Sequence, residues 1–269
     1  MTTRRLRVGI VNYLNSKPLA WGFLKGLHAD RYETLFLPPA QVADRLRAGA
    51  LDLGLIPSIE VQRIPGLRVL HGPCISATEE VRSVLLVARV PLAKIRRIAL
   101  DENSRTSVAL LRIVLAESYG LAPETVTRTA DLESMLADCD AALLIGDPAL
   151  HVDRSRYLVF DLAAEWRRLT GLPFVFAVWA VAPGVDEENL ERHFDDSLRY
   201  GLEHLAELER ETAAELGLDP ALVHAYLTQS LSFHLAAPQR EGLAEFYRRA
   251  ERLGLIDSAR SLEWAGVPA

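Results

Sequence analysis

The sequence predicts an α/β fold of two lobes around a central cleft, followed by a helical C-terminal segment. The main observation is a repeated order of elements (strand, helix, strand, helix, strand) over residues 7–58 and again over residues 97–148. The two copies have matched spacing. Their first helices begin at Ser16 and Ser107, and these two positions lie as far apart in the sequence as the two turns that close the copies. Open α/β sheets bind ligands beyond the carboxyl ends of their strands, so each copy is expected to present polar residues to the cleft.

The first copy contains three predicted strands and two predicted helices. Apolar runs at residues 7–11 and 33–37 predict buried strands, and the apolar spacing of residues 41–48 predicts a helix. Pro18 marks the start of the earlier helix, because proline is pre-organised for a first helical turn. The third strand ends in a turn at residues 56–58.

The second copy follows the same plan. β-Branched and apolar residues predict strands at 97–100 and 125–128. An amphipathic pattern predicts a helix that ends at Gly120, and a second helix is expected at residues 132–137. The third strand runs into a Gly-Asp-Pro turn at residues 146–148.

Two apolar runs predict how the lobes are connected. Residues 83–90 are expected to carry the chain to the second lobe, and residues 174–181 are expected to return it. This division assigns 1–88 plus 181–269 to the first lobe and 89–180 to the second. Two crossings of this kind predict a hinge.

Helical periodicity dominates the chain beyond Pro183. Leucine and phenylalanine recur at helical spacing over residues 190–205, and the same rule holds over residues 221–229 and 239–253. We expect these helices to pack on the first lobe, which makes that lobe discontinuous in sequence.

Composition narrows the class of protein. The chain has 269 residues, 49% of them hydrophobic, and a formal net charge of −6, which argues against nucleic acid as a partner. No apolar run reaches the roughly 18 residues of a membrane span, and the N-terminus does not resemble a signal peptide. Cys74 and Cys139 lie far apart in apolar contexts, as buried free thiols do. We therefore expect a cytoplasmic monomer or homodimer with no membrane partner.

The start of the helix that ends at Gly120 carries a candidate anion site. The strand at residues 97–100 is followed closely by Ser104, Arg105, Thr106 and Ser107, with too few residues between for another helix or strand. The unpaired N–H groups of a first helical turn, the helix dipole, hydroxyl donors and a guanidinium together favour a bound anion. A single N-cap accounts for one of these residues and leaves the others unexplained.

Further candidates follow the ends of other predicted strands. Asn15 can point into the cleft, whereas Ser16 can equally cap the first helix. Asp147 is expected to have a structural role, as a hydrogen-bond acceptor for backbone N–H groups in its turn. Arg105 faces an unfavourable dipole at a helix start, so a bound anion or an acidic partner would account for it. The remaining candidates are turn residues: Pro57, Ser58 and Gly146.

Motifs for cofactors and metals are missing from the sequence. There is no Gly-rich dinucleotide fingerprint, phosphate loop, zinc-spaced histidine pair, cysteine pair or Gly-x-Ser-x-Gly elbow. We therefore expect no cofactor and no metal, and a small anionic ligand as the partner.

Five segments of the chain carry a family resemblance: RVGIVNYLNSKPL at 7–19, LDLGLIPSIE at 51–60, SRTSVAL at 104–110, LIGDPAL at 144–150 and TGLPFVFAVW at 170–179. Together they resemble the chorismate dehydratases of the futalosine route to menaquinone. The resemblance extends nearly end to end. It implies a type II periplasmic-binding-protein-like fold used as a cofactor-free enzyme in the cytoplasm, which converts chorismate to 3-[(1-carboxyvinyl)oxy]benzoate and water.

The resemblance also implies roles for particular residues. The family's catalytically important asparagine falls on Asn15, the serine that begins its crossover strand falls on Ser83, and its helix start falls on residues 104–107. Donors on both lobes suit the two carboxylates of chorismate. The general base is either Asp147 or the substrate's own enolpyruvyl carboxylate, and we favour the latter.

Two alternatives come from different classes. A non-catalytic anion-binding protein would share the fold, although such proteins are normally exported. A 1,4-dihydroxy-6-naphthoate synthase-like enzyme of the same pathway has a related fold. The segments at residues 104–107 and 170–179 favour the dehydratase.

Overall fold

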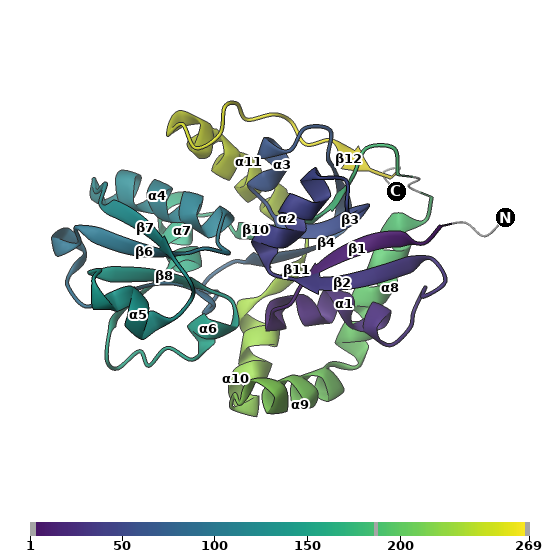
Figure 1. Ribbon diagram of the computed structural model, residues 1–269, viewed down its shortest axis with the longest axis horizontal. Coiled ribbons are helices and arrows are strands. Elements are labelled where there is room, and N and C mark those ends of the chain that lie inside the picture. The colour runs from purple at the N-terminus through teal and green to yellow at the C-terminus, as the bar shows by residue number, and fades with distance from the viewer. Residues whose placement is uncertain (1–3, 186–187, 267–269) are drawn as a thin grey trace.

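The computed structural model describes residues 4–185 and 188–266. It contains two β-sheets side by side, each flanked by helices, with the longest helices of the C-terminal half around the first (Figure 1). The predicted α/β fold of two lobes is confirmed. Among the described residues, no helix is long and apolar enough to cross a membrane.

The first lobe is built on the larger, seven-stranded sheet. Its strand order is β11-β4-β10-β3-β1-β2, with β12 beside β4. The strands are β1 (Leu6–Val11), β2 (Tyr32–Leu37), β3 (Leu53–Pro57), β4 (Arg68–Ala77), β10 (Phe174–Val181), β11 (Ser232–His234) and β12 (Trp264–Ala265). The helices between them are η1 (Leu14–Ser16), α1 (Lys17–Leu24), α2 (Pro39–Arg47) and α3 (Glu60–Arg63).

The second lobe is built on a five-stranded sheet with the order β7-β6-β8-β5-β9. The strands are β5 (Val84–Ala88), β6 (Arg97–Asp101), β7 (Glu124–Arg128), β8 (Ala141–Ile145) and β9 (Leu158–Asp161). The helices are η2 (Leu92–Lys94), α4 (Thr106–Tyr119), α5 (Leu132–Ala137), α6 (Asp147–Leu150) and α7 (Leu162–Thr170).

The repeated order of elements produces the same parallel core in both lobes. β1 pairs in parallel with β2 and β3, and β6 pairs in parallel with β7 and β8. The third strands, β3 and β8, are completely buried, as expected of parallel strands covered by helices on both faces. The carboxyl ends of these strands therefore meet at one edge of each sheet, where the following loops can form a site.

The two crossing strands belong to the opposite lobes from those predicted. β5 was assigned to the first lobe but pairs antiparallel with β8 and β9, and β10 was assigned to the second lobe but pairs antiparallel with β3 and β4. The chain therefore crosses in the loops at residues 78–83 and 171–173. A continuous apolar run indicates a buried strand but carries no information about which sheet will pair with it.

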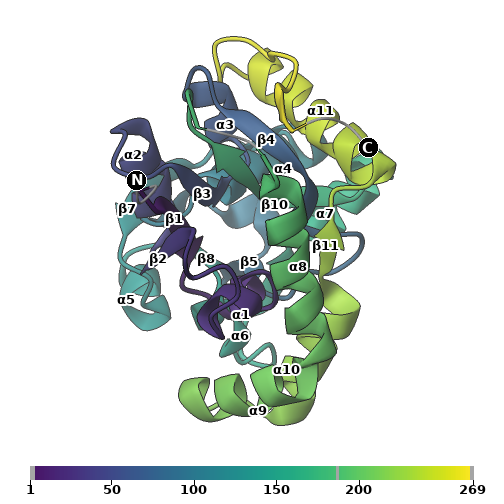
Figure 2. The same ribbon diagram turned by 90° about the vertical axis from the view of Figure 1, so that its right-hand side faces the viewer.

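The C-terminal helices pack mainly on the first lobe, as predicted. α8 contacts α1 and β4, and Figure 2 shows it alongside α1, while α11 contacts β10 and also reaches α4 of the second lobe. Two predicted helices are interrupted, since α8 ends before α9 and α10 continues into a π-helical turn, η3. The bounds are α8 (Leu190–Glu203), α9 (Leu205–Leu216), α10 (Pro220–Ala225), η3 (Tyr226–Ser230) and α11 (Ala237–Arg252).

Candidate functional site

A cavity of ≈ 530 Å³, counted to its open mouth, lies between the two lobes. Residues from both lobes line it: Val11, Tyr13, Asn15, Pro39, Pro57, Ile75, Val81, Ser83, Val84, Asn103, Ser104, Arg105, Thr106, Ser107, Ile145, Gly146, Phe176 and Ala177. The cavity thus brings together most of the predicted site residues, from loops that are far apart in the sequence.

One end of the cavity is the start of α4. No side chain caps this helix, and the N–H groups of its first turn have no carbonyl ahead of them to bond. Ser104 Oγ is also buried without a hydrogen-bond partner among the described residues. Unpaired donors at a helix start, where the dipole is positive, suit a carboxylate.

The opposite polar group comes from Asn15 and Ser83. Asn15 lies in η1, directly after β1, and its Oδ1 is buried with no hydrogen-bond partner in the described chain. Ser83 lies just before β5 and accepts a hydrogen bond from Tyr226 at 2.7 Å. The remaining wall is mostly apolar, with Phe176 offering an aromatic face. The cavity can therefore hold a ring between two sets of uncharged donors and acceptors.

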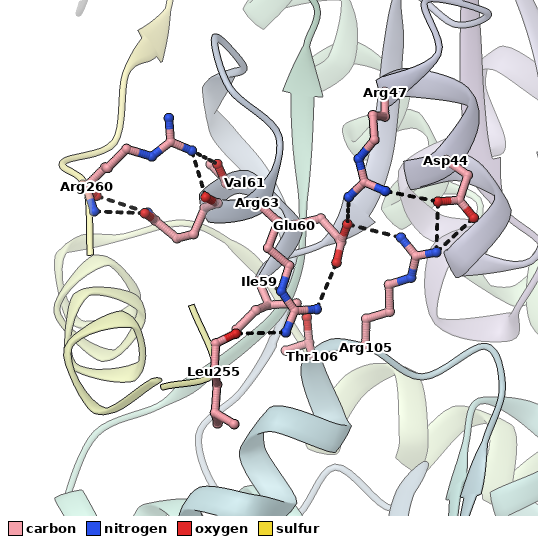
Figure 3. A network of polar contacts seen from close by, with 11 residues as sticks. Asp44, Arg47, Ile59, Glu60, Val61, Arg63, Arg105, Thr106, Leu255 and Arg260 are labelled. Carbon is pink, nitrogen blue, oxygen red and sulfur yellow. Dashed lines mark hydrogen bonds and ion pairs between the residues drawn. The ribbon is translucent and has the colours of Figure 1, made fainter. Parts of the chain in front are cut away.

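Arg105 is the single charged residue among those that line the cavity, and its guanidinium is engaged elsewhere. Its side chain donates to Asp44 at 2.8 Å and to Glu60 at 3.0 Å, both in the first lobe. Glu60 is 1% exposed and also binds Arg47 and Arg63 (Figure 3). The acidic partner that was one explanation of Arg105 is therefore present, and the guanidinium links the lobes.

Thr106 also joins the lobes at the start of α4. Its Oγ1 accepts a hydrogen bond from the N–H of Ile59 at 3.2 Å, next to Glu60 in sequence. The hydroxyl of Ser58 lies 3.4 Å from the same atom but donates to the carbonyl of Val175 at 2.8 Å. Ser58 does not line the cavity, so the structure gives it a role in fixing the strand end.

Asp147 forms a second link between the lobes. Asp147 Oδ1 accepts a hydrogen bond from the N–H of Leu14 at 2.9 Å, and burial raises the pKa of Asp147 to about 6. Gly146 precedes it with φ of 68°, and a Cβ there would lie 2.6 Å from the Tyr13 ring. The predicted turn is the start of the short helix α6, because Pro148 suits a first helical turn. Asp147 does not line the cavity.

Ser16 has a structural role as well. Its hydroxyl donates to the carbonyls of Val11 and Tyr13, so it fixes the loop after β1 and does not cap α1. Ser16 is not among the residues that line the cavity. Its buried hydroxyl holds the turn that presents Asn15.

Several cavity residues were not predicted from the sequence. Tyr13 and Asn103 adjoin predicted residues, so the same loops signalled them. Phe176 lies inside the predicted strand at residues 174–181. Because side chains alternate between the two faces of a strand, this pattern could have indicated the face on which Phe176 lies. Tyr226, which does not line the cavity but contacts Ser83, gave no signal, since that contact joins segments 143 residues apart.

The model of a menaquinone-biosynthesis family matches residues 6–252, which includes both lobes and the cavity. The chain belongs to the menaquinone-biosynthesis family. A chorismate dehydratase of Thermus thermophilus is 33% identical over 92% of this chain and 95% of its own length. A chorismate dehydratase of Campylobacter jejuni is 29% identical over 61% of this chain and 58% of its own.

Solved structures show that the menaquinone-biosynthesis family shares its fold with binding proteins. A protein from Archaeoglobus fulgidus matches with a TM-score of 0.80 and 18% identity, over 94% of this chain and 98% of that one. The periplasmic aliphatic sulphonate binding protein SsuA of Escherichia coli matches with a TM-score of 0.67 and 17% identity, over 96% and 95%. The expected periplasmic-binding-protein-like fold is confirmed.

Proposed function

We propose that this chain dehydrates chorismate to 3-[(1-carboxyvinyl)oxy]benzoate in menaquinone biosynthesis, in the cavity between its lobes. The observation that carries the proposal is a cavity with unpartnered polar groups at two ends, one from each lobe, in a member of this family. Chorismate carries a carboxylate at one ring position and the departing hydroxyl at the opposite one, so it needs two such sets of groups. Two curated relatives are chorismate dehydratases, which supports this substrate over other anions.

The start of α4 is the proposed site of the ring carboxylate. The proton lost in the reaction is at C3, and the charge left by its removal spreads through the diene into that carboxylate. Ser104, Ser107 and the first-turn N–H groups would stabilise this charge without a cation, since Arg105 is paired with Asp44 and Glu60.

The elimination balances without any co-reactant. The C3–H bond breaks, its electron pair completes the aromatic ring, and the C4–O bond breaks toward oxygen. The proton and the departing hydroxide leave as water. Aromatisation makes the reaction strongly downhill, so the enzyme's task is to orient the groups and stabilise charge.

The substrate's own enolpyruvyl carboxylate is the proposed base. Asp147 is ionised at neutral pH, but its oxygen is held by the N–H of Leu14 and it does not line the cavity. The enolpyruvyl group is attached at C3 itself, so its carboxylate reaches the C3 proton once the cavity fixes its rotation. Asn15 and Ser83 are proposed to bind the C4 hydroxyl group.

We also propose that the chain works in the cytoplasm. Cys74 and Cys139 are both free and buried, which suits a reducing compartment. Whether the active form is a monomer or a homodimer stays a prediction, to be measured by light scattering.

The test is direct turnover of chorismate by the purified chain. We expect a product lighter than chorismate by one water, with the absorption of a substituted benzoate. Asn15→Ala is expected to lower kcat about 100-fold or more while KM changes less than about threefold, because the donors of α4 still hold a carboxylate. Unchanged chorismate after incubation with folded wild-type protein contradicts the proposal.

A further inference from the structure

Tyr226 contacts two cavity residues without lining the cavity. Its side chain is 0% exposed, and it begins the π-helical turn η3. Tyr226 Oη donates to Ser83 Oγ at 2.7 Å, and the side chain of Asn15 lies near the same hydroxyl. π-Helical turns inside α-helical segments are frequent at functional sites. Tyr226 thus joins the two polar residues of the same cavity wall.

The direction of these hydrogen bonds follows from the single proton of a phenol. Burial raises the pKa of Tyr226 well above its usual range, so the hydroxyl stays protonated. That proton is donated to Ser83, so toward the neighbouring Asn15 the Tyr226 oxygen can only be an acceptor, which favours the amide nitrogen of Asn15 on that side. Asn15 Oδ1 is left as a buried acceptor, with no donor among the residues that the structure describes.

The same argument fixes the role of the Ser83 hydroxyl. Its oxygen already accepts from Tyr226, and its own O–H has no acceptor among the described residues. A buried hydroxyl without a partner is costly, and a ligand that accepts its proton removes that cost. Ser83 thus remains available as a donor, and Asn15 Oδ1 as an acceptor.

We infer that Tyr226 is a positioning residue, whose hydroxyl fixes Ser83 as a donor and Asn15 Oδ1 as an acceptor toward the C4 hydroxyl group of the substrate. This inference rests on the proposed dehydration of chorismate. A C4 hydroxyl both accepts from Ser83 and donates to Asn15, so one orientation of the leaving group satisfies both residues. Ser83 then stabilises the negative charge that develops on the leaving oxygen. Hydrogen bonds in a chain polarise one another, so donation by Tyr226 makes Ser83 a stronger donor.

Tyr226→Phe is the variant that tests the inference. It keeps the buried ring and removes the hydroxyl, so Ser83 and Asn15 can each adopt other orientations. We expect kcat for chorismate to fall about tenfold or more, while KM changes less than about threefold because the α4 donors are untouched. Stopped-time assays of product, with melting temperatures, measure both effects.

Tyr32→Phe is the matched control. Tyr32 is also buried, and its hydroxyl lies 2.8 Å from His193 Nδ1 in the first lobe, away from the cavity. Its loss should lower the melting temperature by a similar amount and leave kcat and KM as in the wild type. A Tyr226→Phe enzyme that loses stability but keeps wild-type kcat overturns the inference.

A double variant shows whether Tyr226 acts through Ser83. In a Ser83→Ala background the further loss of kcat caused by Tyr226→Phe should shrink at least about threefold, because the hydroxyl then has no serine to orient. Equal losses in both backgrounds overturn the inference. If Tyr226→Phe alone does not fold, the double variant serves instead, since it removes both partners of the hydrogen bond. Its kcat should then lie within about threefold of Ser83→Ala, and a tenfold lower value overturns the inference.

The wild-type enzyme separates the two possible failures. If folded wild-type protein leaves chorismate unchanged, the proposed function fails and the inference fails with it. If the wild type turns over and Tyr226→Phe matches it in kcat, the positioning role alone is wrong.

Discussion

The buried carboxylate of Asp147 is expected to contribute a pH dependence to the stability of the protein. An unfolded aspartate releases its proton near pH 3.9, whereas burial raises the pKa of Asp147 to about 6 in the folded chain. Between these values the folded chain binds more protons than the unfolded chain. The contribution of Asp147 to the free energy of unfolding therefore falls as the pH rises from about 4 to about 6, and the loss is complete above that range.

Asp147→Asn is expected to remove this dependence. An amide oxygen can still accept the hydrogen bond from Leu14, and no charge is then buried. The variant should be more stable than the wild type at pH 7, by up to about 3 kcal/mol, and should differ least near pH 4. Denaturant unfolding at several pH values measures this difference.

The same variant tests the choice of base. If the substrate carboxylate takes the C3 proton, Asp147→Asn should retain kcat within about threefold at pH 7. A folded variant that binds chorismate but does not convert it would transfer the role of base to Asp147. Neither outcome depends on the stability measurement, because kcat is referred to the folded fraction.

At the scale of elements, α4 has a structural role and is also proposed to bind the substrate. Its first turn holds the first lobe through Thr106, while Ser104 beside it has a buried hydroxyl with no partner in the described part of the chain. A buried hydroxyl without a protein partner costs stability. We propose that a bound ligand supplies the missing partner of Ser104.

Ser104→Ala is therefore expected to separate binding from stability. KM for chorismate should rise about fivefold, whereas the melting temperature should stay the same or rise, since an unpaired buried polar atom is removed. Ser197→Ala is the matched control, because the buried hydroxyl of Ser197 donates to the carbonyl of Leu19 at 2.8 Å. It should lose about 1 kcal/mol of stability with KM unchanged. An unaltered KM in Ser104→Ala would contradict the anion site at α4.

The elements that could be predicted from the sequence are those with a local pattern. The helix at residues 132–137 and the strand at residues 174–181 have the predicted bounds. Sheet membership could not be predicted for β5 or β10, because the partner of a buried strand is set by distant chain. β9 and α7 carried no prediction, since β9 is short and partly exposed and its apolar pattern is weak.

The site residues, too, could be predicted where the signal is local and not where it depends on distant parts of the chain. Loops after strands signalled Asn15 and Ser104, because polar residues at strand ends follow from the repeat itself, whereas Ser83 was predicted from the family resemblance alone. The ion pairs of Arg105 could not be located, since Asp44 lies in the other lobe and is 61 residues away. Contacts of that length depend on how the lobes meet, which no local pattern describes.

For the whole molecule, the contacts between lobes flank the cavity. Arg105 binds Asp44 and Glu60 on one side, and Asp147 binds Leu14 on the other. The two crossings between the lobes predict a hinge, and contacts of this kind would favour its closed arrangement over an open one. The apparent affinity for substrate is proportional to the fraction of molecules that are closed, so it falls when that fraction falls.

Asp44→Asn tests this balance without altering a residue that lines the cavity. The Asp44 side chain is 52% exposed, and exposed ion pairs contribute about 0.2–1 kcal/mol, so KM should rise about two- to fivefold at low ionic strength with kcat maintained. The difference from the wild type should shrink in high salt, which screens exposed pairs. Asp138→Asn is the control, because its 46% exposed carboxylate pairs with Arg97 and Arg128 inside the second lobe and should leave KM unchanged. A fall in KM for Asp44→Asn would mean instead that the released Arg105 binds a substrate carboxylate, and the link between lobes would not limit binding.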